Sequence, residues 1–306
     1  RLIFSLAKQI SAIKPDIIHI SGMQSTGFHC TMAALLAKVK CRIITTHGFA
    51  AESNEINPFK KLLFNCIFEP LSLILNHKVH CISLYTKNKR LVRIFAHNKS
   101  KVIYNFPPIN MDVERTDYRK QLGLLENDIV FISASRIVFD KGYDYMIQAI
   151  LHFKKIGNIK FIIVGLGNYL ERVKFELSEQ ISNKQVIILG QRNDVTKIMN
   201  DCDVFVLPTL HEALGNVFIE ASYAKIPSIG TLVGGIPEIV IDKKTGILIP
   251  PHDTESLINA IQSMYENKEN RRTMGRNAYD FAVNKFNHEI IEDEIDELYQ
   301  SVLKKR

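Results

Sequence analysis

Two glutamates, Glu212 and Glu220, have the types and spacing best suited to chemistry in this sequence, with seven residues between them. Apolar residues 204–207 predict a buried strand that stops at Pro208, and the following loop carries Glu212. Helical periodicity over about residues 217–224 places Glu220 in a helix, whose first N–H groups attract anions. A glutamate pair alone also fits an ordinary helix surface. In the strand–proline–loop–helix context, it favours a ligand with phosphate and hydroxyl groups.

A second candidate loop carries Arg136 and Lys141 and follows an apolar run at residues 129–134. Arginine offers a planar fork of donors and lysine a mobile point charge, a combination that suits a diphosphate. The alternative is a surface loop with ordinary basic residues. Gly142 predicts a turn and Tyr143 the start of a helix, and both favour the binding interpretation.

Two glycine turns also follow predicted strands. Gly165 and Gly167 come after the apolar run 161–164 and allow a backbone to approach a ligand closely. The third glycine and the acidic residue of a nicotinamide-binding fingerprint are missing. Residues 234–238 predict another glycine turn that opens a helix, with Pro237 near its first turn.

The elements that must position these residues alternate along the chain. Short β-branched runs and amphipathic stretches indicate βαβ units around parallel sheets, which is an α/β fold. The runs are 17–20, 43–46, 79–82, 102–104, 129–134, 161–164, 186–189, 204–207, 227–230 and 247–249. Helices are expected over residues 1–13, 31–39, 58–75 and 288–299, among others.

The length of 306 residues predicts two domains, and paired prolines at 107 and 108 mark the boundary between them. We expect domains at residues 1–108 and 109–285, joined by a polar linker that extends to about residue 119. The last helix, within residues 286–306, is expected to pack back towards the first domain. Open parallel sheets bind ligands at the carboxyl ends of their strands, so a cleft between the domains is expected.

The charge is unevenly divided between the two halves. Residues 1–108 hold 15 Lys/Arg and 4 Asp/Glu, whereas residues 109–306 hold 24 and 28. This asymmetry favours an anionic partner for the first half. We expect a membrane surface and no nucleic acid, because the cations show no RNA-binding signature. The alternative is a set of solvated lysine-rich faces.

Composition also limits the compartment and the chemistry. Five cysteines without CxxC or Cys/His spacing predict buried thiols, with neither disulfides nor zinc. The chain has no run of eighteen apolar residues that could cross a membrane. We therefore expect a cytoplasmic location, at the inner face of the cell membrane.

Together these motifs give the chain a specific resemblance. Their order and spacing are similar to those of family 4 retaining glycosyltransferases with the GT-B fold, in the group that builds bacterial surface polysaccharides. The resemblance rests on Arg136 with Lys141-Gly142, residues 164–167, Glu212 and Glu220 of the Glu-x7-Glu motif, Gly234-Gly235 with Glu238, and residues 246–250. It covers nearly the whole second half and extends more loosely through the first. It implies two Rossmann-like parallel-sheet domains that face a cleft.

The resemblance implies transfer of a sugar from a nucleoside diphosphate to a saccharide or lipid-linked saccharide, with retention of configuration. No metal and no cofactor are expected besides the substrate itself. Arg136 and Lys141 would bind the diphosphate and stabilise the leaving group. Glu212 would contact the donor sugar together with backbone amides near the residues that start the next helix, which are Leu214, Gly215 and Asn216.

The same resemblance assigns the rest of the site. Glu220 would hold the ribose hydroxyls, Arg192 would lie at the nucleobase, and the Gly165-x-Gly167 turn would line the donor pocket. Thr45-Thr46-His47-Gly48 matches the family's strand-end histidine motif, and His47 would reach across the cleft to the donor sugar. A structural histidine is the alternative for His47.

Two departures from the family pattern are visible. Residues 1–13 predict the helix that normally follows an N-terminal strand and glycine-rich loop, so the first domain is expected to be incomplete. The linker begins Asn105-Phe106-Pro107 where the family has Asn-Gly. An inactive nucleotide-sugar-binding protein and a sugar-nucleotide epimerase are therefore alternatives, although Arg136 and Lys141 with the glutamate pair favour transfer.

Overall fold

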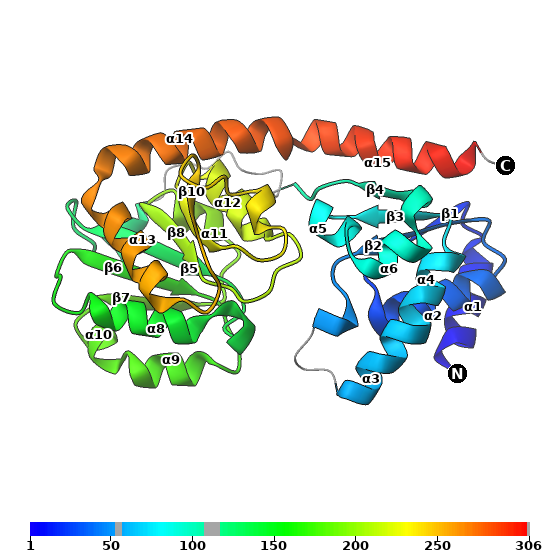
Figure 1. Ribbon diagram of the computed structural model, residues 1–306, viewed down its shortest axis with the longest axis horizontal. Helices are drawn as coiled ribbons and strands as arrows, with labels where there is room; N and C mark the ends of the chain where they lie inside the picture. The colour runs from blue at the N-terminus through cyan, green and yellow to red at the C-terminus, as the bar shows by residue number, and fades with distance from the viewer. Residues whose placement is uncertain (53–56, 107–116, 305–306) are drawn as a thin grey trace. The chain divides into compact units, whose positions relative to one another are not determined.

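The structure is a computed structural model that describes residues 1–52, 57–106 and 117–304. Its contacts divide the chain into two compact units (Figure 1). The N-terminal unit contains Arg1–Asn105 and His288–Arg306, and the C-terminal unit contains Phe106–Asn287. The predicted linker residues 107–116, with their two prolines, lie outside the described residues.

The N-terminal unit is built on a four-stranded parallel sheet with strand order β1-β2-β3-β4. Its core is formed by side chains such as Ile44, Leu73, Val79 and Val92, which are buried between the sheet and its helices. The strands are β1 (Ile17–Ser21), β2 (Cys41–Thr46), β3 (Lys78–Cys81) and β4 (Ser100–Val102). The helices include α1 (Leu2–Ile13), α2 (Gln24–Leu36), α5 (Leu84–Lys87) and α6 (Arg90–Phe95).

The helix predicted over residues 58–75 is confirmed as three consecutive helical segments. These are α3 (Pro58–Leu63), one π turn η2 (Phe64–Phe68) and α4 (Glu69–Leu75). Asn57 caps the start because its side chain accepts a hydrogen bond from the Phe59 N–H, and Pro58 suits the first helical position. Asn76 is extended and ends the helix.

The last helix, α15 (His288–Leu303), packs on the sheet of the N-terminal unit. The Tyr299 hydroxyl lies 3.0 Å from His19 Nδ1, and Cys41 Sγ donates to the Val302 carbonyl at 3.3 Å. Lys101 and Glu297 add an ion pair at 2.9 Å. The first and last parts of the chain therefore fold together.

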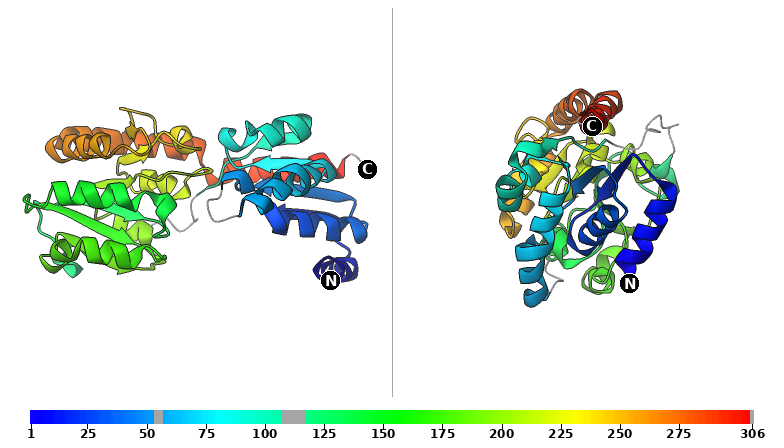
Figure 2. Two further views of the ribbon diagram at one scale, coloured as in Figure 1. Left: turned by 60° about the horizontal axis from the view of Figure 1, so that its bottom comes forward. Right: turned by 90° about the vertical axis from the view of Figure 1, so that its right-hand side faces the viewer.

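The C-terminal unit has a six-stranded parallel sheet with strand order β10-β9-β8-β5-β6-β7. Helices lie on both of its faces (Figures 1 and 2). The strands are β5 (Ile129–Ala134), β6 (Ile159–Val164), β7 (Val186–Gly190), β8 (Val204–Leu207), β9 (Ser228–Thr231) and β10 (Gly246–Ile249). The helices are α7 (Tyr118–Gln121), α8 (Tyr143–His152), α9 (Leu170–Glu176), α10 (Ser178–Ser182), α11 (Val195–Met199), α12 (Asn216–Tyr223), α13 (Thr254–Glu266) and α14 (Lys268–Lys285).

The strand order of this sheet reverses between β5 and β8. From β5 the sheet grows through β6 to β7 in one direction, and from β8 it grows through β9 to β10 in the other. In open α/β sheets, the loops that leave such a switch point diverge and form a crevice for a ligand. The loops after β5 and β8 are the ones that carry Lys141 and Glu212.

Four local predictions differ from the structure. The helix expected over residues 31–39 begins earlier and is α2, Gln24–Leu36. The predicted strand 102–104 is β4, Ser100–Val102, since its last ladder bond runs from the Ile103 N–H to Cys81. The helix predicted after Gly234 is only a 3-10 turn, Ile236–Glu238, because the chain soon enters a bridge between Asp242 and Gly246. The thiols were predicted to be buried, but Cys66 on η2 is exposed and Cys30 is partly exposed.

Candidate functional site

The loops after β5 and β8 are joined directly by hydrogen bonds. The Asp140 carbonyl accepts from the Leu210 N–H at 2.8 Å and from the Thr209 hydroxyl at 3.0 Å. The Thr231 hydroxyl donates in turn to the Thr209 carbonyl at 2.5 Å. The loop after β8 is therefore fixed between its two neighbours in the sheet.

This junction brings Lys141 and Glu212 together. The Lys141 ammonium forms an ion pair with Glu212 Oε2, and the side chains are only 15% and 21% exposed. Lys141 ends the 3-10 turn η4 (Phe139–Lys141), and Gly142 turns the chain into α8 with φ of 75°. A Cβ on Gly142 would lie 1.9 Å from the Pro208 carbonyl oxygen, so only glycine lets the loops approach this closely.

A third loop, the glycine turn at Gly234, packs against the backbone of Glu212. Gly234 has φ of 57°, and a Cβ there would lie 1.5 Å from the carbonyl oxygen of Glu212. No side chain fits at that distance, so the backbone of the Gly234 turn lies directly against the backbone of Glu212. The sequence indicated a glycine turn here, and the structure shows that the turn positions the glutamate.

Beside this ion pair lies a hollow of about 350 Å³ at the carboxyl ends of β5, β6 and β7. It brings together four of the predicted site residues, which are Arg136, Gly165, Arg192 and Glu220. Arg136 is exposed, whereas Glu220 is half-buried. This burial raises the pKa of Glu220. A half-buried carboxylate in this position is suited to accept hydrogen bonds from hydroxyl groups, which would stabilise its charged form.

The glycines of the turn after β6 have a packing role. A Cβ on Gly165 would lie 1.9 Å from the Ser135 carbonyl oxygen, and one on Gly167 would lie 2.1 Å from that of Ile137. The Ile137 N–H donates to the Leu166 carbonyl at 2.8 Å. The two turns are therefore joined along their backbones, which places Arg136 at the rim of the hollow.

Arg192 is held by two residues that the sequence analysis missed. Its guanidinium contacts both carboxylate oxygens of Asp194, at 2.8 and 2.6 Å, and lies 3.4 Å from the Tyr118 hydroxyl. The hydrogen bond from Arg192 is the main reason that the pKa of Asp194 falls to about 2. The signal in the sequence was an aspartate two residues after the arginine.

The start of α12 completes the surroundings of Glu212. Gly215 has a left-handed backbone at the N-cap, and Asn216 is the first helical residue and is exposed. Leu214 is only 1% exposed, so its backbone rather than its side chain is suited to contact a ligand.

His47 follows β2 in the N-terminal unit. Its Nε2 lies 2.9 Å from the Ser21 hydroxyl, and partial burial lowers its pKa although the residue as a whole is exposed. Behind it, Thr45 links two histidines of the neighbouring strands, with His19 Nε2 at 2.7 Å and His80 Nδ1 at 3.1 Å. Burial is the main reason that the pKa of His19 falls to about 4.

The sequence analysis also missed Glu69, which shapes the loop after His47. This carboxyl group is fully buried on α4, and its Oε1 accepts from the Ala50 N–H at 2.7 Å. Among the described residues Glu69 Oε2 has no hydrogen-bond partner, and burial raises the pKa of the group to about 7. The signal was the single acidic residue in an otherwise basic and apolar stretch.

Two features are absent from the described part of the chain. Within residues 1–52, 57–106 and 117–304, no three His, Cys, Asp or Glu side chains gather in a way that could hold a metal ion. No helix within those ranges is long and apolar enough to span a membrane.

Two parallel-sheet units, with a basic and acidic site at the switch point of the second, are the architecture of GT-B transferases. A family model described as glycosyl transferases group 1 matches residues 114–281, and one described as glycosyl transferase 4-like matches residues 1–78. The chain therefore belongs to the group 1 glycosyltransferases, and the predicted family and fold class are confirmed.

Related sequences and solved structures agree with this assignment. The chain is 28% identical over 305 residues to the capsular polysaccharide biosynthesis glycosyltransferase CapM of Staphylococcus aureus, covering 95% of this chain and 78% of that one. It is 29% identical to the UDP-Gal:alpha-D-GlcNAc-diphosphoundecaprenol alpha-1,3-galactosyltransferase of Escherichia coli, covering 97% and 78%. Anabaena HepE in complex with UDP-glucose superposes with a TM-score of 0.84 at 22% identity, covering 98% and 82%, which shows the shared fold.

Proposed function

We propose that this glycosyltransferase uses a nucleoside-diphosphate sugar as donor and a saccharide or lipid-linked saccharide as acceptor. The observation that carries the proposal is the Lys141–Glu212 ion pair at the switch point, beside the hollow that Arg136 and Glu220 line. The names of the relatives support it, since the Escherichia coli enzyme uses UDP-galactose and a diphosphoundecaprenol-linked sugar.

In the proposed reaction, the bond between the anomeric carbon and the terminal phosphate oxygen breaks, and that oxygen takes the bonding electrons. Lys141 and Arg136 stabilise the charge on the departing diphosphate, together with the N–H groups at the start of α12. The acceptor hydroxyl oxygen forms the new bond to the anomeric carbon, and its proton passes to the departing diphosphate. The family resemblance assigns retention of configuration to this transfer.

The other site residues have binding roles in this proposal. Glu212 accepts hydrogen bonds from the donor sugar while remaining next to Lys141, and Glu220 accepts them from the ribose in the hollow. Arg192 lies at the nucleobase, where Asp194 and Tyr118 fix its guanidinium. Backbone groups of residues 214–216 hold the sugar and phosphate, and the family resemblance assigns His47 a contact with the donor sugar.

The same proposal covers cofactors, partners and location. The cations Arg136 and Lys141 supply the charge that a divalent ion supplies in other transferases, so no metal or cofactor is required. The enzyme works in the cytoplasm, at the inner face of the cell membrane, and binds no nucleic acid.

Isothermal calorimetry with a panel of nucleoside diphosphates tests the site. Lys141→Ala and Arg136→Ala should each weaken binding of the preferred diphosphate by about tenfold or more, as expected for loss of a charged hydrogen bond. Lys174→Ala is the matched control, because Lys174 pairs with Glu171 on the exposed face of α9. Unchanged affinity in both site variants would refute the assignment.

A further inference from the structure

The helix formed by residues 58–75 exposes a row of large apolar side chains. Phe59 is 74% exposed and Leu62 62%, and the row continues through Ile67, Leu71 and Ile74. Steps of three to five residues keep these side chains on one face, and the five-residue step from Leu62 to Ile67 crosses the π turn, whose hydrogen bonds span five residues. With Ile94 of the adjacent α6, these five residues form what we call the apolar face.

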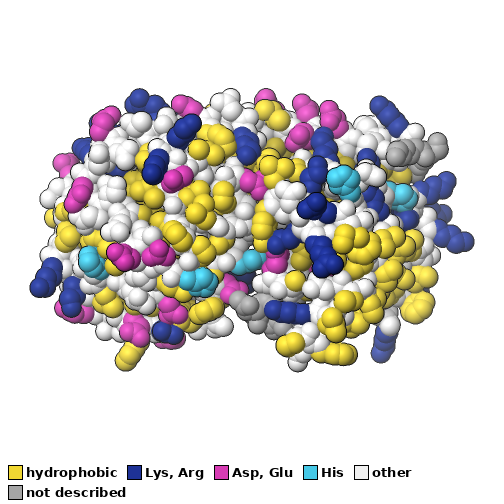
Figure 3. All heavy atoms as spheres, in the orientation of Figure 1, with side chains coloured by type: hydrophobic (Ala, Val, Ile, Leu, Met, Phe, Trp, Pro, Cys, Tyr) yellow, Lys and Arg dark blue, Asp and Glu magenta, His cyan; other side chains and the backbone are white. Residues whose placement is uncertain are grey.

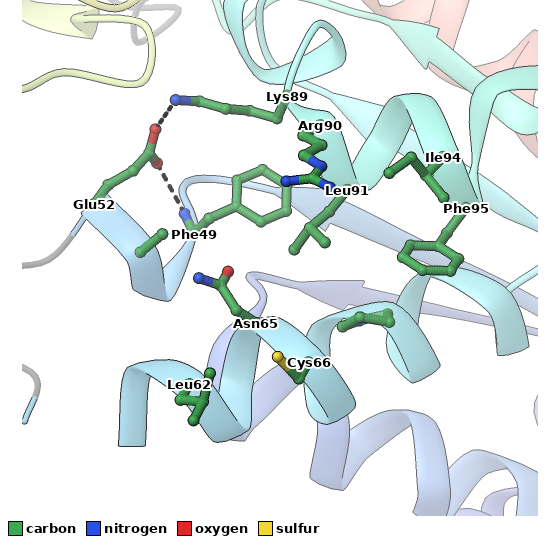
Figure 4. Close-up of a pocket in the computed structure, with 12 residues that line it drawn as sticks. Phe49, Glu52, Leu62, Asn65, Cys66, Lys89, Arg90, Leu91, Ile94 and Phe95 are labelled. Carbon is green, nitrogen blue, oxygen red and sulfur yellow. Dashed lines mark hydrogen bonds and ion pairs between the residues drawn. The ribbon is translucent and has the colours of Figure 1, made fainter. Parts of the chain in front are cut away.

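A pocket of about 620 Å³ opens beside this face (Figure 4). Its lining is mainly apolar and comes from the helix, from α6 and from the loop after β2, including Leu62, Cys66, Phe49, Leu91 and Phe95. A continuous apolar surface of this kind marks a site of interaction.

The wall contributed by the loop after β2 is held in place by Glu52. Its carboxylate accepts from the Phe49 N–H at 3.0 Å and from the Tyr85 hydroxyl at 2.7 Å, and it forms an ion pair with Lys89. Among the described residues, the pocket lining contains two cations, Lys89 and Arg90, and the ion pair with Glu52 neutralises Lys89. The cavity therefore offers apolar contact far more than polar recognition.

Positive charge dominates the segment that carries the apolar face. Residues 57–99 contain eight Lys/Arg and one acidic residue, Glu69, which is fully buried. Lys60, Arg90 and Arg93 are exposed. In Figure 3, hydrophobic side chains gather over α3 and α4, with Lys and Arg side chains beside them.

An apolar pocket and face bordered by cations matches an amphiphile with a hydrocarbon chain and an anionic head group. Large apolar side chains enter the acyl boundary of a bilayer, and each nearby Lys or Arg adds about 1 kcal/mol on an anionic surface. A soluble acidic protein would satisfy the cations, but it would not account for an open cavity with a mainly apolar lining.

We propose that the apolar face docks on an anionic lipid bilayer and that the pocket takes one hydrocarbon chain. This inference rests on the proposed location at the inner membrane face and deepens it by assigning the surface that docks, although docking itself requires no donor and no turnover. It also bears on the proposed function, because Phe49 of the pocket wall follows His47 by two positions. A lipid held in the pocket lies beside the loop that carries His47.

Vesicle flotation tests the docking surface. The wild-type chain should float with vesicles of phosphatidylcholine plus phosphatidylglycerol, should do so less at high salt, and should not float with phosphatidylcholine alone. Arg90→Glu with Arg93→Glu should lower the partition coefficient by about tenfold or more. Leu62→Ser with Ile67→Ser should lower it by a similar factor, because two apolar side chains then no longer enter the bilayer.

Two control variants carry a charge reversal and an apolar-to-serine change on the C-terminal unit. Arg272→Glu with Arg276→Glu reverses two exposed charges of α14, and Phe175→Ser removes an apolar side chain that is 80% exposed on α9. Both should float like the wild type, and the melting temperature of every variant should confirm folding. Cys66 lines the pocket, so a bimane label on it, in a Cys30→Ser background, should shift to the blue on anionic vesicles only.

Three results would overturn the proposal. The first is no flotation of the wild type on anionic vesicles at low salt, and the second is equal flotation of the face variants. The third is a concentration-dependent dimer in sedimentation that the face variants abolish, which would make the occupant a second copy of the chain. None of these results depends on transfer activity, so donor binding and sugar transfer are tested separately from membrane docking.

Discussion

Lys141 forms an ion pair with Glu212, although 71 positions separate the two residues in the sequence. The family resemblance gave them separate tasks, with the lysine on the diphosphate and the glutamate on the sugar. Their contact means that the cation is balanced before any ligand arrives. A diphosphate must therefore share the Lys141 ammonium with the carboxylate.

Glu212→Gln should separate donor binding from transfer. Removal of the negative charge leaves Lys141 free for phosphate, so affinity for the nucleoside diphosphate should stay the same or rise by a few fold, on the order of 1 kcal/mol. Transfer should fall by about a hundredfold or more, because the amide contacts the sugar more weakly in the transition state. Calorimetry and initial rates measure the two effects.

The control for this variant is Glu171→Gln, which breaks an exposed lysine pair on α9 and should change neither quantity. If Glu212→Gln weakened diphosphate binding as strongly as transfer, the ion pair would be needed to hold Lys141 in place, and separate roles would be excluded.

Gly234→Ala should damage the site through the backbone of Glu212. The added Cβ would meet the Glu212 carbonyl oxygen at 1.5 Å, and φ of 57° is unfavourable for alanine. We expect a loss of about 2 kcal/mol or more in the free energy of unfolding in urea, together with weaker donor binding. Gly157→Ala is the control, since a Cβ there meets no atom within 4 Å. Equal stability of the two variants would contradict the packing described for the Gly234 turn.

Glu69→Gln should change how stability depends on pH. Burial raises the pKa of Glu69 from 4.5 to about 7 in the folded chain, so the folded state holds this proton more tightly than the unfolded state. The associated stability is present below pH 4.5 and is lost as the pH rises through about 7. Glu69→Gln stays neutral at every pH, so it does not lose this stability as the pH rises. Its amide oxygen still accepts a hydrogen bond from the Ala50 N–H.

Urea unfolding across pH measures this effect. The difference in unfolding free energy, variant minus wild type, should be larger above pH 7 than below pH 4.5 by about 3 kcal/mol. A difference that stays constant across this range would show that Glu69 titrates normally and does not carry the buried proton.

Chelation tests the proposal that cationic side chains replace a metal. Transfer measured in EDTA should equal that measured in magnesium, because Arg136 and Lys141 supply the charge that stabilises the leaving diphosphate. A rate that vanished in EDTA and returned with a divalent cation would contradict this part of the account.

Much of this organisation could be predicted from the sequence because it is local. The runs 129–134 and 204–207 are confirmed as β5 and β8 residue for residue, since buried parallel strands are continuous apolar runs. Contact between Lys141 and Glu212 could not be predicted in the same way. It depends on the position of β5 next to β8 in the sheet, although two other strands come between them in the chain.

Other features depended on tertiary contacts that no spacing reveals. Glu69 has an ordinary place in a helical pattern, and only the fold buries it against Ala50. Gly165 lines the hollow, but the close approach of Gly165 and Gly167 to the backbone of Ser135 and Ile137 depends on the fold and could not be predicted from a short glycine motif.

The most direct test is a panel of nucleotide sugars, each incubated with the wild-type chain and with Lys141→Ala, with product and released nucleoside diphosphate measured by mass spectrometry. One donor should be consumed in the presence of a diphospholipid-linked sugar acceptor, and Lys141→Ala should lower that rate by about a hundredfold or more. Turnover that is unchanged in Lys141→Ala would contradict the account of the site. Transfer from no nucleotide sugar to any acceptor would contradict the proposed function itself.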